Sequence, residues 1–311
     1  MVGISNTISL SADLMGHGNP AWPNFWPPMF ETYAQDFQKQ SRAEYIGISI
    51  VVKREEKESY LNYSAHAYEN AIKDSHIIRY GNLDHLNQNT SLYKNMFTQK
   101  GPKGFVEDED RDLYIVRNNG SPPPRKYGSP INWNLHSNPG SKGPMDASIV
   151  LRNETTFSKV KPFKGISEEE HRKYHSTKDG PKNPHFFAYH PVHRFAGDTD
   201  SDIVAILSAA TAFDASMQNL LPENVKGMLC VVENTCNQTE SYMIDGHDAF
   251  YQGSEDLHDP KYNDLVVHVD LSLHEHPEAP STPGHCLFTM VSFDSSKMQL
   301  SSNLFLQALL L

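Results

Sequence analysis

The chain has 311 residues and a formal net charge of -11, which is enough sequence for one large domain or two smaller ones. Hydrophobic residues make up 38% of the chain and charged residues 21%, so the composition is globular and not that of a disordered protein. The acidic balance argues against a nucleic-acid-binding surface, because phosphate binding needs clustered basic residues.

No stretch of 18 consecutive apolar residues occurs, so the sequence shows no complete membrane span. The first residues also lack the charged and apolar regions of a signal peptide. The last three residues, 309–311, are all leucine. They predict either a short terminal helix that packs on the body or the first residues of a membrane segment.

Residues 1–28 contain four prolines and predict an irregular lead-in. Apolar residues then recur at helical spacing over 29–42, alternate as in a strand over 45–52, and return to helical spacing over 54–74. Acidic residues at the start of the second helix favour it through the helix dipole. We therefore expect a helix, a strand and a second helix.

Between 75 and 180 the pattern is weaker. Strands are expected at 113–118 and 147–153, with a proline-rich loop over 118–134 between them. A capping signal at Ser167 predicts a short helix.

After residue 184 the chain reads as short strands separated by Gly, Pro and Asn turns, with one short helix that starts at Phe213. The expected strands lie at 185–194, 202–211, 227–234, 241–246, 265–273 and 285–293. The fold class that follows is α+β, with a helix–strand–helix part followed by a PAS-like antiparallel sheet with one short helix. The expected divisions are a lead-in over 1–28, a first part over 29–180, a sheet part over 181–300 and a tail over 301–311.

Asn-x-Ser/Thr sequons favour an extracellular or lumenal location, and ordinary polar turns of a cytosolic protein are the alternative. The five sequon asparagines are Asn62, Asn89, Asn119, Asn153 and Asn237. Of these, Asn89, Asn119 and Asn237 lie in predicted loops or turns.

The three cysteines predict one disulfide and one free thiol. Cys230 lies within an apolar run and is expected to be buried as a free thiol. If the last strand pairs beside the 227–233 segment, Cys236 and Cys286 come close enough for a bridge. The alternative is three free thiols in a reducing compartment.

Sixteen histidines raise the possibility of a metal site, but no HExxH or comparable spacing occurs. The histidines that such a site would draw on are His185, His190, His193, His247, His258, His274 and His276. The 245–248 segment reads as an acid–base group or as a turn closed by Gly246, and the acidic residues of 255–264 as a calcium loop or a solvated turn. No catalytic residue, metal ligand or cofactor is therefore assigned. A secreted metal-dependent or acid–base hydrolase remains the alternative function, and a purely structural glycoprotein is a third.

Several short elements share a pattern with a known family. They are residues 27–31, the 45–52 strand, Arg54, residues 60–64, 131–135 and 220–222, the segments GMLCVVENTC and SYMIDG, and residues 256–259 with Tyr262. In these elements the chain resembles the extracellular CHASE- or Cache-like sensor region of receptor-type nucleotide cyclases of diatoms and other unicellular eukaryotes. The resemblance spans about residues 20–300. Two features depart from the family, since Tyr60 stands where a tryptophan is expected and no cyclase domain is present.

The resemblance implies a fragment or a sensor without its output: a non-catalytic domain that binds a small-molecule ligand outside the cell. Membrane attachment and any cyclase activity would lie in segments outside this chain, and a homodimer is compatible with such a receptor. For a sensor, the expected ligand contacts are aromatic residues on the strands and the short helix. They are Phe187, Tyr189, Phe213, Tyr242 and Tyr251.

Overall fold

The protein is described by a computed structural model, which covers Ile8 and residues 22–86, 95–100, 104–107, 110–123, 131–162, 183–270 and 285–293. It is a mixed α+β protein with antiparallel sheets, which confirms the predicted fold class. The chain divides into two compact units. Unit 1 comprises 1–38, 45–156 and 188–209, and unit 2 comprises 39–44, 157–187 and 210–311.

The first sheet has the strand order β4-β1-β8-β7-β5. Its strands are β1 (Tyr45–Lys53), β4 (Leu113–Ser121), β5 (Thr156–Phe157), β7 (Pro184–His193) and β8 (Ile203–Ala212), and β6 (Lys161–Pro162) also pairs with β7. Counted along the chain, the five strands of the main path lie in the order second, first, fifth, fourth, third. A separate hairpin joins β2 (Phe97–Lys100) and β3 (Gly104–Glu107).

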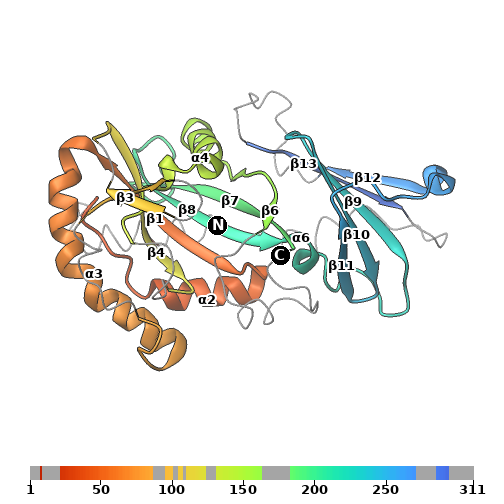
Figure 1. The fold of residues 1–311 in the computed structure, drawn as a ribbon, viewed down its shortest axis with the longest axis horizontal. Helices are drawn as coiled ribbons and strands as arrows, with labels where there is room; N and C mark the ends of the chain where they lie inside the picture. Colours follow the sequence, from red (N-terminus) through yellow and green to blue (C-terminus); the bar gives the residue numbers. More distant parts are fainter. Residues whose placement is uncertain are drawn as a thin grey trace. The chain divides into compact units, whose positions relative to one another are not determined.

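Helices lie on both faces of this sheet (Figure 1). Helices α2 (Phe30–Ser41) and α3 (Lys57–Tyr80) cover one face, where the Ser121 hydroxyl of β4 donates to Glu31 Oε1 of α2 at 2.9 Å. Helix α4 (Pro139–Leu151) covers the other, where the Tyr189 hydroxyl of β7 donates to Ser141 Oγ at 3.1 Å. We call this second surface the α4 face.

A buried polar network ties α3 to the sheet within unit 1. The Tyr68 hydroxyl donates to the Tyr60 hydroxyl at 2.9 Å, and the Tyr60 hydroxyl donates to Asn132 Oδ1 at 3.2 Å. The Asn118 amide donates to the Tyr68 hydroxyl. Because these side chains are fully buried, the hydrogen bonds offset the cost of removing polar groups from water.

The second sheet lies entirely in unit 2 and has the order β11-β10-β9-β13-β12, with every neighbouring pair antiparallel. Its strands are β9 (Met228–Asn234), β10 (Gln238–Asp245), β11 (Asp248–Gly253), β12 (Val266–Asp270) and β13 (Phe288–Phe293). Alternate β9 residues Met228, Cys230 and Val232 join a core cluster with α6 (Phe213–Ser216), as the two-residue period of a strand requires. The other short elements are the 3-10 turns η1 (Arg54–Glu56), η3 (Leu135–Ser137) and η5 (Pro260–Leu265).

The predicted strand at 147–153 is wrong, because these residues form the end of α4 and the turn that follows it. The Asn138 side chain accepts a hydrogen bond from Gly140 N at 2.9 Å, and Pro139 occupies the first helical turn. The β-branched residues Ile149 and Val150 favour a strand locally, but packing of the helix against the sheet overrides that preference.

The division between the units differs from the predicted boundary at 180/181. Residues 188–209 belong to unit 1, because β7 and β8 pair within the first sheet. The helix predicted at Ser167 and the tail over 301–311 lie outside the described residues. Within the part of the chain that the structure describes, no helix is long and apolar enough to cross a membrane.

Candidate ligand-binding site

The α4 face of unit 1 carries an aromatic and polar surface on β1 and β4. Along β1 the isoleucines Ile46, Ile48 and Ile50 are fully buried. Ile46 pairs with Ser121, whose hydroxyl bonds to α2, so these isoleucines face α2 and α3. The alternating residues Tyr45, Gly47 and Ser49 must therefore face the opposite way.

Two glycines provide the surface on which the Tyr45 ring lies. Gly47 and Gly120 are direct cross-strand partners. A Cβ atom at Gly47 would lie 2.4 Å from the Tyr45 hydroxyl oxygen, and one at Gly120 would lie 2.7 Å from the ring. Any larger residue at either position would displace the ring, so the glycine pair determines where Tyr45 lies.

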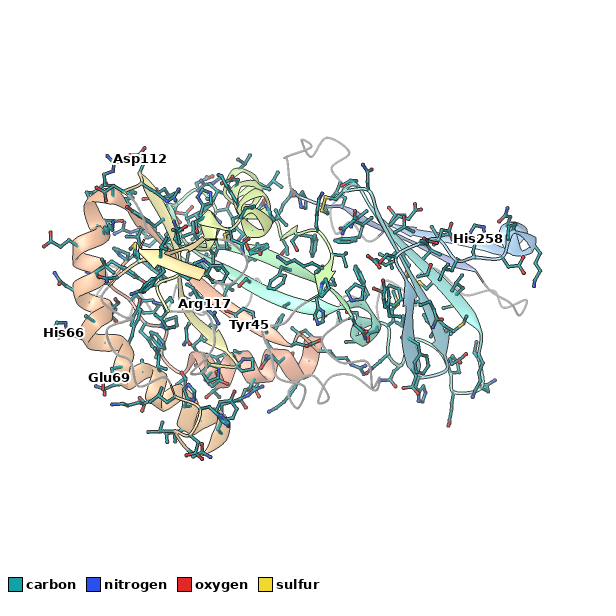
Figure 2. All side chains as sticks on the ribbon, in the orientation of Figure 1. Tyr45, His66, Glu69, Asp112, Arg117 and His258 are labelled. Carbon is teal, nitrogen blue, oxygen red and sulfur yellow. A yellow bond between two sulfur atoms is a disulfide. The ribbon has the colours of Figure 1, made fainter. Side chains whose placement is uncertain are left out.

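Arg117 of β4 lies next to the same ring, with its guanidinium carbon 5.3 Å from the ring centroid (Figure 2). Backbone hydrogen bonds hold the residue: its amide donates to Trp133 O at 2.8 Å, and Asn132 N donates to its carbonyl at 3.0 Å. The side chain is half-buried, and its Nε is buried with no hydrogen-bond partner among the described residues.

Ser49 is the direct cross-strand partner of Arg117. Directly opposed residues on neighbouring strands have side chains on the same face, with Cβ atoms about 4.5–5.5 Å apart. The Ser49 side chain is 1% exposed, and its hydroxyl has no partner among the described residues. In this pair, neither the Arg117 Nε–H group nor the Ser49 hydroxyl makes a hydrogen bond to a residue that the structure describes.

Tyr189 connects this surface to α4. Its hydroxyl bonds to Ser141, and burial raises its pKa, with the hydrogen bond to Ser141 opposing the rise and the nearby Tyr45 hydroxyl adding to it. The Tyr189 phenol is therefore neutral at physiological pH and serves as a hydrogen-bond donor. Tyr189 is the predicted ligand residue that lies on this surface.

Of the other predicted ligand residues, three lie in a separate core, and Phe187 lies two residues before Tyr189 on the same face of β7. Phe213, Tyr242 and Tyr251 come together in unit 2, with ring centroids 6.1 Å apart for Phe213 and Tyr242 and 5.5 Å apart for Tyr242 and Tyr251. Phe213 and Tyr242 are core residues of the cluster beneath β9 and β10. Phe187 is half-buried on β7, with the Lys161 ammonium 5.0 Å from its ring centroid. The structure therefore brings three of the five predicted residues together, and two of these three are buried in a hydrophobic core.

The carboxyl group of Glu240 and the Tyr242 hydroxyl lie beside the aromatic rings of this core. The Tyr251 hydroxyl donates to Glu240 Oε2 at 2.8 Å, and burial raises the pKa of the Glu240 carboxyl. The Tyr242 hydroxyl is fully buried and has no partner among the described residues, and burial raises its pKa as well. Both groups therefore favour their neutral forms more than exposed groups would.

The histidines are distributed among separate hydrogen bonds. His185 Nε2 lies 2.6 Å from Glu44 Oε1 in a fully buried pair, and His190 Nδ1 lies 3.1 Å from Thr155 Oγ1. His193 contacts backbone carbonyls, and His258 lies 2.6 Å from Asp256. Among the described residues, no group of three or more His, Cys, Asp or Glu side chains could hold a metal ion. His274 and His276 lie outside those residues.

The 245–248 segment is a turn, as one of its two interpretations predicts. Gly246 has φ 63°, and Asp245 Oδ1 accepts a hydrogen bond from Gly227 N at 2.7 Å. A Cβ at Gly246 would lie 2.8 Å from Glu223 O, so the turn requires glycine. In the acidic 255–264 segment, Asp259 pairs with Lys261 at 2.5 Å, so that carboxylate is neutralised within the chain.

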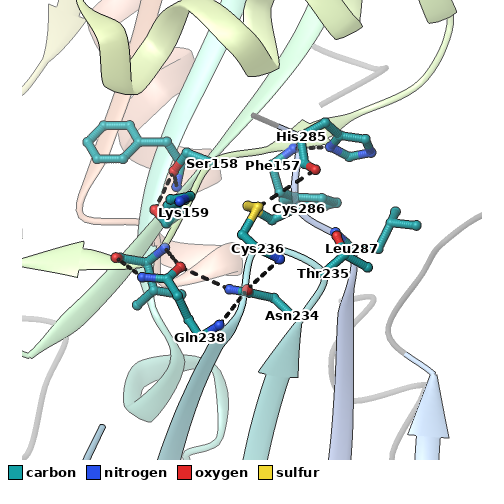
Figure 3. The surroundings of a disulfide bond; sticks show 12 residues. Phe157, Ser158, Lys159, Asn234, Thr235, Cys236, Gln238, His285, Cys286 and Leu287 are labelled. Carbon is teal, nitrogen blue, oxygen red and sulfur yellow. Dashed lines mark hydrogen bonds between the residues drawn. A yellow bond between two sulfur atoms is a disulfide. The ribbon is translucent and has the colours of Figure 1, made fainter. Parts of the chain in front are cut away.

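The predicted disulfide between Cys236 and Cys286 is confirmed, and Cys230 is a buried free thiol, also as predicted. Figure 3 shows the bridge at the turn after β9, where Asn234 Oδ1 accepts from the amides of Cys236 and Gln238. Thr235 N donates to Leu287 O at 3.0 Å, which brings the second cysteine alongside. Such a bridge is typical of an oxidising, extracellular or secretory environment.

Three of the predicted glycosylation positions are exposed: Asn62, Asn153 and Asn237. Asn119 was expected in a loop, and this is wrong, because Asn119 is a fully buried residue of β4. The strand extends through Gly120 to Ser121 despite the turn-forming sequence, since β1 pairs with it along its length. Asn89 lies outside the described residues.

The reasoning from sequence did not select Tyr45, Ser49 or Arg117. One signal was present: Gly47 interrupts an alternating strand, and a glycine inside a strand indicates a close approach of another group. The cross-strand partner of that glycine lies 73 positions away in the sequence (47 and 120), so the pairing that assembles the surface could not be read locally.

Comparisons with models of known protein families and with curated protein sequences find no match to this chain. The case for function therefore depends on the topology and on the chemistry of the α4 face.

Proposed function

We propose that this chain is an extracellular domain that senses a small ligand and belongs to a receptor-type nucleotide cyclase or a similar membrane receptor. The observation that carries the proposal is the strand order of the first sheet: second, first, fifth, fourth, third. This sheet is formed by strands between residues 45 and 212, whereas the PAS-like sheet was expected over 181–300. PAS-type sensor sheets have this order. A fold supports many functions, so the proposal also needs a suitable surface.

The α4 face supplies such a surface. Ligand sites combine apolar and aromatic walls with a few polar groups that orient the ligand. Tyr45 and Tyr189 are the aromatic residues here, and Arg117 and Ser49 are the polar ones. All four belong to unit 1.

The compartment is supported by covalent chemistry. The Cys236–Cys286 bridge suits an oxidising environment, and the exposed sequons at Asn62, Asn153 and Asn237 suit passage through the secretory pathway. These features favour the extracellular face of a membrane.

The assignment to a cyclase receptor is supported by the resemblance in sequence described above. On this proposal the chain itself is non-catalytic and needs no cofactor. Membrane attachment and nucleotide cyclisation are functions of segments outside it, and the ligand signal passes to them.

The proposal is tested by sequencing the transcript on both sides of the segment that encodes these 311 residues. We expect it to encode a membrane-spanning helix followed by a nucleotide cyclase or another signalling domain. In membranes that carry this receptor, ligand addition should change the rate of cyclic nucleotide formation. A transcript that joins this segment to no membrane helix and no signalling domain would contradict the proposal.

A further inference from the structure

We infer that Lys161 is a covalent modification site, at which the side-chain amine takes up a small aldehyde as an imine. Lys161 lies on β6, within unit 2. The inference goes beyond the proposed function, because it concerns the reactivity of one amine and needs no receptor. It is carried by the place of the ammonium beside the Phe187 ring and by the lack of a counter-ion among the described residues.

The backbone around Lys161 is held from two sides. Lys161 is directly opposite His185 in the β6–β7 ladder. The preceding residue is fixed by a side chain: Val160 N donates to Gln238 Oε1 at 2.8 Å, and Gln238 Nε2 donates to Val160 O at 2.8 Å. The Lys161 side chain therefore starts from one defined position.

The surroundings of the Lys161 ammonium are aromatic. The residue is half-buried, and its Nζ lies 5.0 Å from the centroid of the Phe187 ring. A ring face attracts a cation but supplies no negative charge. Among the described residues, no carboxylate or other acceptor pairs with this ammonium. The carboxylate that reaches the opposite residue is already engaged, since Glu44 Oε1 lies 2.6 Å from His185 Nε2.

Other lysines of the described chain have a carboxylate within reach. These pairs are Lys57–Asp110, Lys73–Glu69, Lys142–Asp146 and Lys261–Asp259. A carboxylate stabilises the ammonium form, and Lys161 lacks this stabilisation. Burial lowers the pKa of the Lys161 ammonium, because water is removed from the charge and no carboxylate replaces it. At neutral pH, a larger share of Lys161 is therefore free amine than of an exposed lysine.

A free lysine amine that is partly removed from water is a nucleophile for carbonyl compounds. The nitrogen lone pair attacks the carbonyl carbon and a C–N bond forms. The carbonyl oxygen then leaves as water with both protons of the amine, so the step needs no oxidant, reductant or metal. A protonated imine keeps a positive charge beside the Phe187 ring, which preserves the cation–ring attraction. An aldehyde is favoured over a ketone, because a half-buried amine is reached more readily by the less crowded carbonyl.

The test measures where small aldehydes react on the whole folded chain. The protein is incubated with butanal or benzaldehyde, the imine is reduced with cyanoborohydride, and peptide fragmentation in the mass spectrometer locates each alkylated lysine. Lys159 is the matched control, because it is exposed and lies two positions away. At neutral pH we expect Lys161 to be alkylated at least about threefold faster than Lys159, since more of it is free amine.

Two further readouts separate this reactivity from simple accessibility. The ratio of the Lys161 rate to the Lys159 rate should fall as the pH rises from about 7 to about 10, because an exposed lysine gains free amine over this range. In urea-unfolded protein the two rates should be equal, because the two lysines then have the same surroundings. Burial without a change in reactivity would instead slow alkylation of Lys161 at every pH.

Two variants locate the reaction. Lys161→Arg keeps the charge beside Phe187 and should abolish the fast alkylation, whereas Lys159→Arg should leave it unchanged. If Lys161→Arg does not fold, the comparisons on the wild-type protein decide the question.

Equal or slower alkylation of Lys161 in the folded protein, a ratio of rates that persists in urea, or a ratio that does not change with pH would each overturn the inference. Any of these results would leave the proposed function standing. A transcript without a receptor would remove the proposed function but not the fast alkylation of Lys161.

Discussion

The Tyr45 side chain owes its position to two residues that have no side chain. Gly47 and Gly120 are paired across β1 and β4, and the ring lies where their Cβ atoms would be. The arginine that carries the candidate site lies beside that ring. The position of the Tyr45 ring therefore depends on the absence of a side chain at Gly47 and Gly120.

Replacing Gly120 by alanine should lower the free energy of unfolding by about 1–3 kcal/mol, as overpacking of a buried site does. The added Cβ would lie 2.7 Å from ring atoms of Tyr45. In a Tyr45→Ala background the same change should be neutral or stabilising, because the ring is gone. Urea unfolding of the four proteins of this double-mutant cycle measures the coupling.

Gly253→Ala is the control for that cycle. It is also a strand glycine, but its Cβ would meet Leu257 at an ordinary 3.5 Å. Its effect should stay within about 0.5 kcal/mol. Equal losses at Gly120 with and without Tyr45 would contradict the role assigned to the ring.

A second prediction concerns Glu240 and pH. Burial raises the pKa of this carboxyl above its ordinary value of 4.5, so the folded state binds the proton more tightly than the unfolded state. Stability therefore falls as the pH rises from the unfolded pKa through the folded pKa, and it stays constant above. Glu240→Gln keeps an acceptor for Tyr251 and should lack this decline. Urea midpoints from about pH 4 to about pH 7 measure the difference.

Glu233→Gln, at an exposed residue of the neighbouring strand β9, is the control for Glu240. It should follow the wild-type profile. A constant difference in midpoint between wild type and Glu240→Gln across this range would contradict the prediction.

At the scale of elements, a disulfide bond links the turn after β9 to the residues just before β13 in the second sheet. The bridge joins cysteines 50 positions apart, and Asn234 organises the turn that carries the first of them. Closing a loop of this length limits the unfolded chain more than the folded one.

Replacing both Cys236 and Cys286 by serine should lower the free energy of unfolding by about 4 kcal/mol, by the loop-entropy relation. Denaturant unfolding measures the loss. Non-reducing peptide maps should show the bridge, with Cys230 alkylated only after unfolding because it is buried. Three alkylatable thiols in protein unfolded without a reductant would contradict both the bridge and the compartment.

The elements differ in how well the sequence predicted them. Strands β8 and β9 were expected at nearly their observed bounds, because alternation and β-branched residues reflect a pleated, half-buried surface. Helix α4 was missed because Gly140, Gly143 and the internal Pro144 disfavour a helix locally. Its Asn138 cap and its packing against the sheet outweigh that preference.

At the scale of the whole molecule, the question is where glycans can be attached. A glycan at Asn119 would prevent β4 from pairing with β1, so chains modified there would not fold. The exposed asparagines 62, 153 and 237 have no such restriction.

Secretion from a eukaryotic host should therefore yield protein modified at Asn62, Asn153 and Asn237 and unmodified at Asn119. Peptide mass spectrometry after glycosidase treatment locates the modified residues. Asn153→Gln should remove the mass of one glycan, and a glycan on Asn119 of the folded protein would contradict the structure.

The sequence by itself determined the α+β class, most strands and the disulfide pair, which suits an oxidising environment. These depend on local periodicity and on residues whose chemistry is specific wherever they lie. Only the tertiary structure decided that β7 and β8 complete the first sheet, and that Tyr45, Ser49 and Arg117 meet on its α4 face. The physical reason is that strand pairing joins positions that are distant in the sequence. A site needs several side chains close together, and here it is the pairing of strands that brings them together.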